Sequence, residues 1–259
     1  MLNQKEYYQK VKELNIKHYA GEVSYYSQAP VRKVEKAILA KLKQGTNLLD
    51  LGCGSGRFSI GAAQEGFNVT GVDITPQAID AAKQKAKKLE IKNANFLVGD
   101  MTILPFKDKI FDYVFCPRFS INAVATFSQR EKAIEEMLRV VKDNGVVFVE
   151  SFNGLYLGNG IVFLFKNILR DVGRYFIMLR CRLENKKYKG LLPGDIVYKA
   201  NKVDTASKGY AHLPTVLELF RLMPKNIKFK FYSIPQITCV RKIDFLKFFR
   251  YSIWIFIEK

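Results

Sequence analysis

The stretch from Asn47 to Asp73, NLLDLGCGSGRFSIGAAQEGFNVTGVD, most constrains what this chain of 259 residues can fold into. It begins with a short apolar run, which is typical of a strand buried on both faces of a parallel sheet. Gly52, Gly54 and Gly56 follow as G-x-G-x-G, which permits a sharp turn and the close approach of a ligand. A helix and a second strand complete the unit. The pattern predicts a ligand at the carboxyl end of a parallel α/β sheet.

Two acidic residues in this stretch indicate the kind of ligand. Asp73 ends the second strand, where a carboxylate can accept hydrogen bonds from both hydroxyls of a ribose. Asp50 precedes the first glycine, where its charge would repel a phosphate and attract an ammonium group. The glycine spacing also differs from the G-x-G-x-x-G that suits a pyrophosphate. These features favour S-adenosylmethionine and disfavour a dinucleotide oxidoreductase.

The segments LLDLGCGSGRF and VTGVDIT closely resemble the first two motifs of class I S-adenosylmethionine-dependent methyltransferases. The Gly99-Asp100 pair and the run FDYVFC…EEMLRVVKDNGVVFVES are similar to later parts of the same family, so the resemblance covers roughly 47–152. It implies an α/β fold with a Rossmann-like, doubly wound, mostly parallel sheet of seven strands. The last strand is expected to insert antiparallel between the fifth and the sixth. The resemblance also implies S-adenosylmethionine as cofactor, S-adenosylhomocysteine as product, and methyl transfer by in-line displacement, with no metal.

We expect a single domain over 1–259 with four parts. Residues 1–44 are predicted to form two helices on either side of HYAGEVSYYSQAP, and the resemblance implies that this segment covers the cofactor. The cofactor-binding core is expected at 45–152, with a turn at Asp143-Asn144-Gly145 before its fifth strand. In this family an insertion like 153–209 commonly forms a substrate lid. Residues 210–259 are predicted to complete the sheet.

The candidate cofactor contacts lie at successive strand ends. Asp100 can accept a hydrogen bond from an adenine amino group, and Met101 can cover the ring. The resemblance places further contacts in the glycine turn, after the fourth strand and among N-terminal tyrosines. The full set is Asp50, Gly52, Cys53, Gly54, Gly56, Asp73, Ile74, Asp100, Met101, Cys116, Pro117, Tyr19 and Tyr26.

The residues after the fourth strand bear on the acceptor. CPRFSIN lacks the N-P-P-[YF] or D-P-P-[YF] motif of base-amino methyltransferases and the Pro-Cys context of RNA cytosine C5 enzymes. This favours a small-molecule or lipid-like acceptor, with Arg118, Phe119 and Asn122 as candidate contacts. His212 is a candidate base or hydrogen-bond donor, although a lone histidine is more often structural.

Charge leaves the class of partner open. Residues 1–150 hold 22 basic and 17 acidic residues, whereas 151–259 hold 20 and 7, so net charges of +5 and +13 make up the total of +18. The basic half suits an anionic acceptor, a lipid surface or a nucleic acid, and equally a lysine-rich solvated surface. The basic half thus keeps RNA methylation as an alternative, which the missing motifs of base-modifying methyltransferases make less favoured. A membrane-surface protein that retains the fold, with lipid contact through 158–182, is another. The oligomeric state is left open.

The cysteines and the hydropathy pattern bear on the compartment. Cys53, Cys116, Cys181 and Cys239 form no C-x-x-C pair, so neither a zinc site nor a disulfide framework is indicated. The first residues lack an apolar signal core, and no uncharged apolar run reaches the roughly 18 residues of a spanning helix. We expect a cytoplasmic protein with free thiols, able to contact a membrane surface peripherally.

Overall fold

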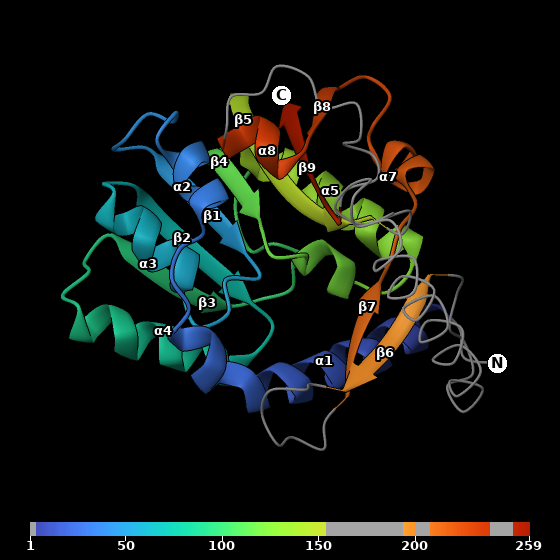
Figure 1. Cartoon of the computed structure of the whole chain (residues 1–259), viewed down its shortest axis with the longest axis horizontal. Helices are drawn as coiled ribbons and strands as arrows, with labels where there is room; N and C mark the ends of the chain where they lie inside the picture. Colours follow the sequence, from blue (N-terminus) through green and yellow to red (C-terminus); the bar gives the residue numbers. More distant parts are fainter. Residues whose placement is uncertain (1–3, 154–193, 200–207, 239–250) are drawn as a thin grey trace, which may run out of the picture.

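The computed structural model describes residues 4–153, 194–199, 208–238 and 251–259. Its centre is a sheet of seven strands in the order β3-β2-β1-β4-β5-β9-β8 (Figure 1). The first five strands are parallel, and β9 runs antiparallel between β5 and β8. This confirms the predicted fold class, including the inserted last strand. The strands are β1 (Asn47–Leu51), β2 (Asn68–Asp73), β3 (Ala94–Val98), β4 (Phe111–Cys116), β5 (Val141–Phe152), β8 (Lys228–Tyr232) and β9 (Ser252–Glu258).

Helices cover both faces of the sheet because successive strand residues point to opposite faces. Thus Leu48 and Trp254 pack with α2 (Lys33–Leu39), α3 (Arg57–Gln64) and α8 (Ile234–Thr238) on one face. Leu49 and Ile255 pack with α5 (Phe127–Val140) and α7 (Val216–Leu222) on the other face. The helix α4 (Pro76–Lys88) packs beside β2 and β3. All four of these strand residues are fully buried, so the strands with ligand-binding ends are anchored in the core.

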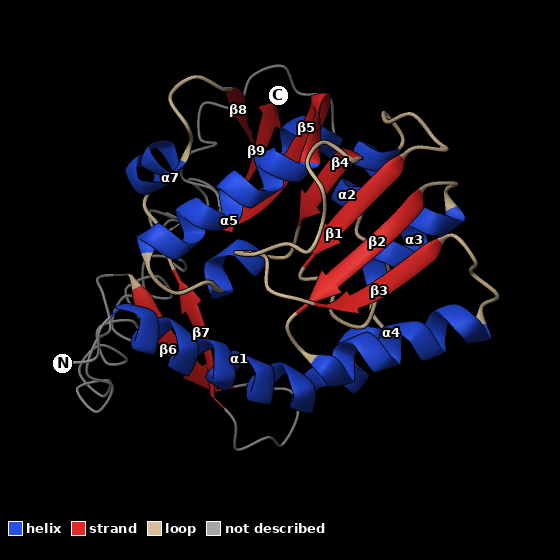
Figure 2. Ribbon diagram, turned by 180° about the vertical axis from the view of Figure 1, so that it is seen from behind, coloured by secondary structure: helices blue, strands red, loops and turns tan. Residues whose placement is uncertain are grey.

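A second layer lies across the carboxyl ends of the parallel strands. It consists of α1 (Gln4–Ser27) and the antiparallel hairpin of β6 (Asp195–Lys199) and β7 (Lys208–His212) (Figure 2). The helix α1 packs on α4 and β7, and the short helix η1 (Ser120–Ala123) contacts β7 from the sheet side. This layer closes the end of the sheet where ligands bind in such folds.

The structure has two N-terminal helices, as predicted, but the first of them is longer than expected. The helix α1 continues to Ser27, through most of the expected link. The buried face of α1 includes Asn15, His18 and Glu22. Because these residues are polar, the sequence of the helix lacks the regular spacing of apolar residues that predicts a buried helical face. The side-chain amide of Asn15 has hydrogen-bond partners outside α1: its Nδ2 donates to Ala123 O at 3.0 Å, and its Oδ1 accepts from Tyr210 N at 2.9 Å.

The predicted turn at Asp143-Asn144-Gly145 lies inside β5. The pairing of β4 with β5 steps from Phe111–Val141 to Tyr113–Val146, so extra residues bulge out of β5. Such a bulge interrupts the pairing without ending the strand. The turn residues thus mark an irregularity in one long strand.

Several predictions lie outside the described residues. These are most of the expected lid, the lipid-contact segment 158–182 and the side chain of Tyr26. Within the described ranges, no helix has both the length and the apolar character needed to cross a bilayer.

Candidate functional site

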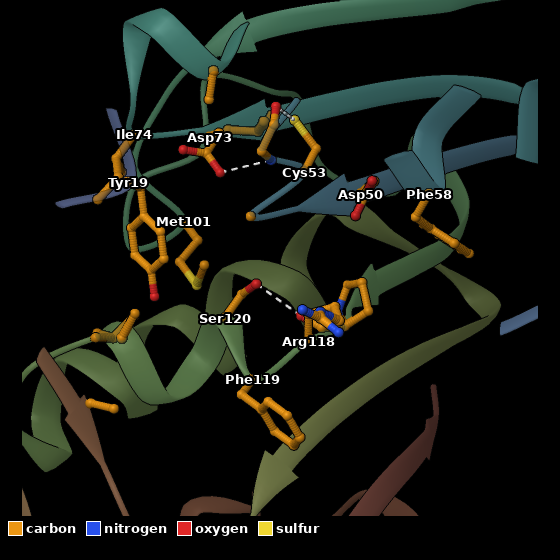
Figure 3. A pocket seen from close by; sticks show the side chains of 18 of the residues that line it. Tyr19, Asp50, Cys53, Phe58, Asp73, Ile74, Met101, Arg118, Phe119 and Ser120 are labelled. Atoms are coloured by element: carbon orange, nitrogen blue, oxygen red, sulfur yellow. Dashed lines mark hydrogen bonds between the residues drawn. The ribbon is translucent and has the colours of Figure 1, made fainter. Parts of the chain in front are cut away.

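A cavity of about 630 Å³ lies between the carboxyl ends of the parallel strands and the layer of α1 and the hairpin. This size is within the range of ligand pockets. Figure 3 shows Tyr19, Ile74 and Met101 along one side and Arg118 and Phe119 along the other. The residues that line the cavity include Tyr8, Lys12, Tyr19, Asp50, Gly52, Cys53, Gly54, Arg57, Asp73, Ile74, Asp100, Met101, Pro117, Arg118, Phe119, Phe152, Ile196, Tyr198 and Tyr251.

The glycine turn after β1 forms the floor of the cavity. Gly52 and Gly54 have φ of +71° and +54°, which L side chains rarely adopt. A Cβ on Gly52 would overlap the side chain of Ser120, so this glycine permits the close approach of η1. A Cβ on Gly54 would have nothing within 4 Å and would project into open space. Gly54 therefore leaves room at the cavity floor.

Asp50 lies at the end of β1 with its side chain fully buried. Its Oδ2 accepts a hydrogen bond from Ser59 Oγ of α3 at 2.5 Å, whereas Oδ1 has no hydrogen-bond partner among the described residues. Burial raises the pKa of the carboxyl to about 7. A buried, unpartnered carboxylate oxygen is costly, and an ammonium group in the cavity would offset that cost.

Asp73 lies at the end of β2 and holds the glycine turn. Its Oδ2 accepts a hydrogen bond from Gly54 N at 2.9 Å (Figure 3), and its Oδ1 accepts one from Thr75 N at 2.8 Å. Burial raises its pKa. A carboxylate offers about four acceptor positions, so two remain for hydroxyl groups of a ligand. Asp73 can therefore bind a diol and position the turn at once.

Asp100, after β3, is already bound by α1. Lys12 Nζ lies 2.8 Å from Oδ2, Tyr8 Oη donates to the same carboxylate at 2.7 Å, and Thr102 donates through N and Oγ1. Burial opposes ionisation, but these donors outweigh it and lower the pKa of Asp100. An adenine amino group would have to share or replace one of these donors. The adenine contact of Asp100 therefore stays a prediction, while Met101 beside it lines the cavity.

The segment after β4 forms the opposite wall. Arg118 and Phe119 both have left-handed backbones, with φ of +55° and +63°. Arg118 N donates to Glu150 Oε2 at 2.7 Å, which fixes the unusual turn from the end of β5. Phe119 stacks on Phe152 with ring centroids 3.8 Å apart and planes at 12°. The ring of Tyr251 lies edge-on to both, at 5.6 and 5.4 Å.

The structure brings most of the predicted cofactor residues together. Of the predicted acceptor-side residues, it places Arg118 in the cavity lining and Asn122 and His212 outside it. Pro117 and Arg118 line the cavity, whereas Gly56 and Cys116 do not. Asn122 is buried and structural: its Nδ2 donates to Ser151 Oγ and His212 O, and its Oδ1 accepts from Phe152 N.

His212 is also held away from the cavity lining. Its Nδ1 lies 2.7 Å from Asp195 Oδ1 and its Nε2 lies 2.8 Å from Glu218 Oε1. Burial alone would lower its pKa, but the hydrogen bonds to Asp195 and Glu218 raise it. Since both ring nitrogens are engaged, His212 joins the hairpin to α7, and we assign it no role as a base.

Several residues that line the cavity were not among those predicted from the sequence. Tyr8 and Lys12 have the spacing of one helical face, but their target Asp100 lies 88 residues or more away. Arg57 follows the last glycine of the motif and pairs with buried Glu35 of α2. Tyr198 and Tyr251 reach the cavity from distant segments. Arg57 could have been found from its position next to the glycine motif. For Tyr8, Lys12, Tyr198 and Tyr251, no local sequence pattern indicates a place in the cavity.

Comparison with known proteins identifies similar sequences and folds. A family model described as a methyltransferase domain matches residues 42–205. A demethylmenaquinone methyltransferase of Bacillus mycoides (strain KBAB4) is 32% identical over 160 residues. That match covers 60% of this chain and 65% of the relative, so the chain spans about 65% of the relative's length.

Two solved structures share the fold over nearly the whole chain. The CcbJ methyltransferase of Streptomyces caelestis has a TM-score of 0.65 at 13% identity and covers 93% of this chain and 98% of its own. A SAM-dependent methyltransferase of Methanosarcina mazei has a TM-score of 0.57 at 22% identity, with coverages of 86% and 96%. At these identities the likeness concerns the fold.

Proposed function

The chain belongs to the methyltransferase-domain family, and from this premise we propose that it transfers a methyl group from S-adenosylmethionine to a small or lipid-like acceptor. The observation that carries the proposal is Asp50 Oδ1, a buried carboxylate oxygen without a hydrogen-bond partner among the described residues, at a cavity floor that Gly54 leaves open. An amino-acid ammonium group is the cation that fits this place. Asp73, one strand away, retains acceptor positions for a ribose diol.

Each residue has a defined part in this function. S-adenosylmethionine supplies an electrophilic methyl group on a sulfonium. Asp50 would accept a hydrogen bond from the ammonium of its amino-acid end, and Asp73 would accept hydrogen bonds from the ribose hydroxyls. Ile74 and Met101, which line the same cavity, would contact the base. Phe119, Phe152 and Tyr251 form an aromatic wall of the same cavity, and these apolar rings would exclude water from the place of the acceptor. Aligning two reactants and excluding water are the main requirements for this displacement.

The aromatic wall supports the proposal of a small or lipid-like acceptor. Its stacked rings suit an apolar group better than a phosphate backbone. The name of the Bacillus mycoides relative gives demethylmenaquinone as what that enzyme acts on, which is consistent with a lipid-like acceptor here. Lipid contact through 158–182 and an anionic acceptor stay predictions.

Isothermal titration with S-adenosylhomocysteine tests the cofactor site. Wild-type protein is expected to bind, and Asp50→Asn is expected to bind at least about tenfold more weakly, since a charged hydrogen bond is lost. Asp80→Asn removes the same charge at an exposed position of α4 that does not line the cavity, and it is the matched control. Absence of binding by wild-type protein would refute the proposed cofactor.

The acceptor class is tested by labelling. Protein is incubated with methyl-tritiated S-adenosylmethionine and a total cell extract, which is then divided into an organic phase and a nucleic-acid precipitate. We expect label in the organic phase. Label in the nucleic acid would replace this acceptor class with RNA methylation, and label in neither fraction would count against catalysis.

A further inference from the structure

The part of the cavity that faces the aromatic wall contains a pair of tyrosine hydroxyls. Tyr19 reaches it from α1 and Tyr198 reaches it from β6, and both residues line the cavity. Their Oη atoms lie 3.3 Å apart, within hydrogen-bond distance, although 179 residues separate them in the chain. Figure 3 shows Tyr19 beside Ile74 and Met101, across the pocket from Phe119. The pair therefore provides a polar point opposite a flat apolar surface.

The phenol of Tyr198 is suited to donate a hydrogen bond. Burial raises its pKa, so it carries its proton at neutral pH. A phenol accepts and donates at the same time. Tyr198 can thus accept from Tyr19 and still donate its own proton to a group in the cavity.

Packing holds the ring of Tyr198 in one place. His18, fully buried, contacts the rings of Tyr19 and Tyr198 edge-on, at centroid distances of 5.1 and 5.2 Å. Behind them Gly209 has no side chain, and a Cβ there would lie 2.7 Å from Tyr198 Cζ. A hydroxyl fixed by such packing is preorganised, so it loses little conformational entropy when it binds a ligand.

We propose that Tyr198, with Tyr19, is the specificity-determining polar contact for the methyl acceptor, and that the acceptor is a flat conjugated ring that carries an oxygen substituent. The ring face lies on the cluster of Phe119, Phe152 and Tyr251, and the oxygen accepts the hydrogen bond of Tyr198. Ring-on-ring contact favours a planar ligand, and a fixed donor disfavours an analogue without the oxygen, because the donor then loses its partner. This inference rests on the proposed function, since it assigns the acceptor side of the same cavity.

The test compares two ligands that differ by one oxygen. Binding of 2-naphthol and of naphthalene is measured by equilibrium dialysis with saturating S-adenosylhomocysteine. Wild-type protein is expected to bind 2-naphthol about tenfold more tightly, the equivalent of one hydrogen bond. Tyr198→Phe is expected to make the two affinities equal while the affinity for naphthalene is unchanged. Tyr19→Phe is expected to reduce the preference in part.

Two controls separate this inference from other effects. Tyr113→Phe removes a hydroxyl that accepts from Lys43 N outside the cavity, and it should keep the tenfold preference. Phe152→Leu should weaken the binding of 2-naphthol and of naphthalene to the same extent. The inference is overturned if Tyr198→Phe keeps the preference or if wild-type protein binds neither ligand. If S-adenosylhomocysteine itself does not bind, the proposed function fails; if it binds and Tyr198→Phe changes nothing, only the inference about the acceptor fails.

Discussion

The carboxylate of Glu150 accepts a hydrogen bond from the backbone N–H of Arg118 at 2.7 Å. Glu150 is fully buried at the end of β5, and it also accepts from the Arg32 guanidinium and from Ser252 Oγ. Arg32 in turn pairs with Glu35, which pairs with Arg57 at the glycine turn. One chain of charges therefore links the cofactor side of the cavity to the loop that carries Phe119.

Glu150→Ala is expected to destabilise the protein strongly. The change leaves Arg118 N without its acceptor and removes one of the two carboxylates that neutralise Arg32. Breaking a buried pair in this way costs about 3–5 kcal/mol. Urea unfolding measures the loss, and Glu150→Gln, which keeps an acceptor, should lose less. Asp143→Ala removes an exposed partner of Lys109 and should leave the unfolding free energy nearly unchanged; equal losses in both variants would contradict the assigned network.

Gly54→Ala and Gly45→Ala form a matched pair. Both glycines have positive φ, +54° and +76°, and at neither position would an added methyl group have another atom within 4 Å. Each variant should lose about 1 kcal/mol of stability from the left-handed backbone. Only Gly54 lines the cavity, so only Gly54→Ala should weaken S-adenosylhomocysteine binding, by about tenfold or more. Calorimetry and urea unfolding on both variants check this, and equal binding by the two would place the ligand elsewhere.

Cofactor affinity is expected to depend on pH through Asp50. Burial raises the pKa of this carboxyl to about 7, and only the ionised form attracts an ammonium group. Below pH 7 a proton must leave before the ligand binds, so affinity should fall by about tenfold per pH unit between pH 7 and 5. Titrations of S-adenosylhomocysteine across this range measure the slope. Asp50→Asn should bind weakly with no such slope, and a slope that persists in this variant would assign the titration to another group.

His212 should make stability depend on pH in a defined direction. Its hydrogen bonds to Asp195 and Glu218 raise its folded-state pKa above the ordinary value of 6.5. The stabilisation is therefore fully present below pH 6.5 and is lost as pH rises through the folded-state pKa. The difference in unfolding free energy between wild type and His212→Gln should be larger at pH 6 than at pH 9. A difference that grows with pH would refute a protonated His212.

The elements that carry the proposed cofactor contacts were predictable because their signals are local. The strand, turn and helix from Asn47 onward, with Asp50 and Asp73 at strand ends, follow from apolar runs, glycines and the spacing of acids. The predicted family and the seven-stranded sheet with antiparallel β9 are confirmed. His212 shows the opposite case. Its reactivity marked it as a candidate, but Asp195 and Glu218, from two other elements, occupy both of its nitrogens.

The sequence by itself determined the strands and the glycine turn, because neighbours within a few residues set backbone conformation and strand burial. The arrangement of the sheet and the methyl donor followed from the resemblance of these motifs to a known family. Only the tertiary structure decided what faces the cavity floor. Lys12 and Tyr8 meet Asp100, Tyr19 meets Tyr198, and Phe119 meets Phe152 through chain segments far apart in sequence. Such contacts depend on how α1, the hairpin and β5 pack against one another, and no local pattern encodes that packing.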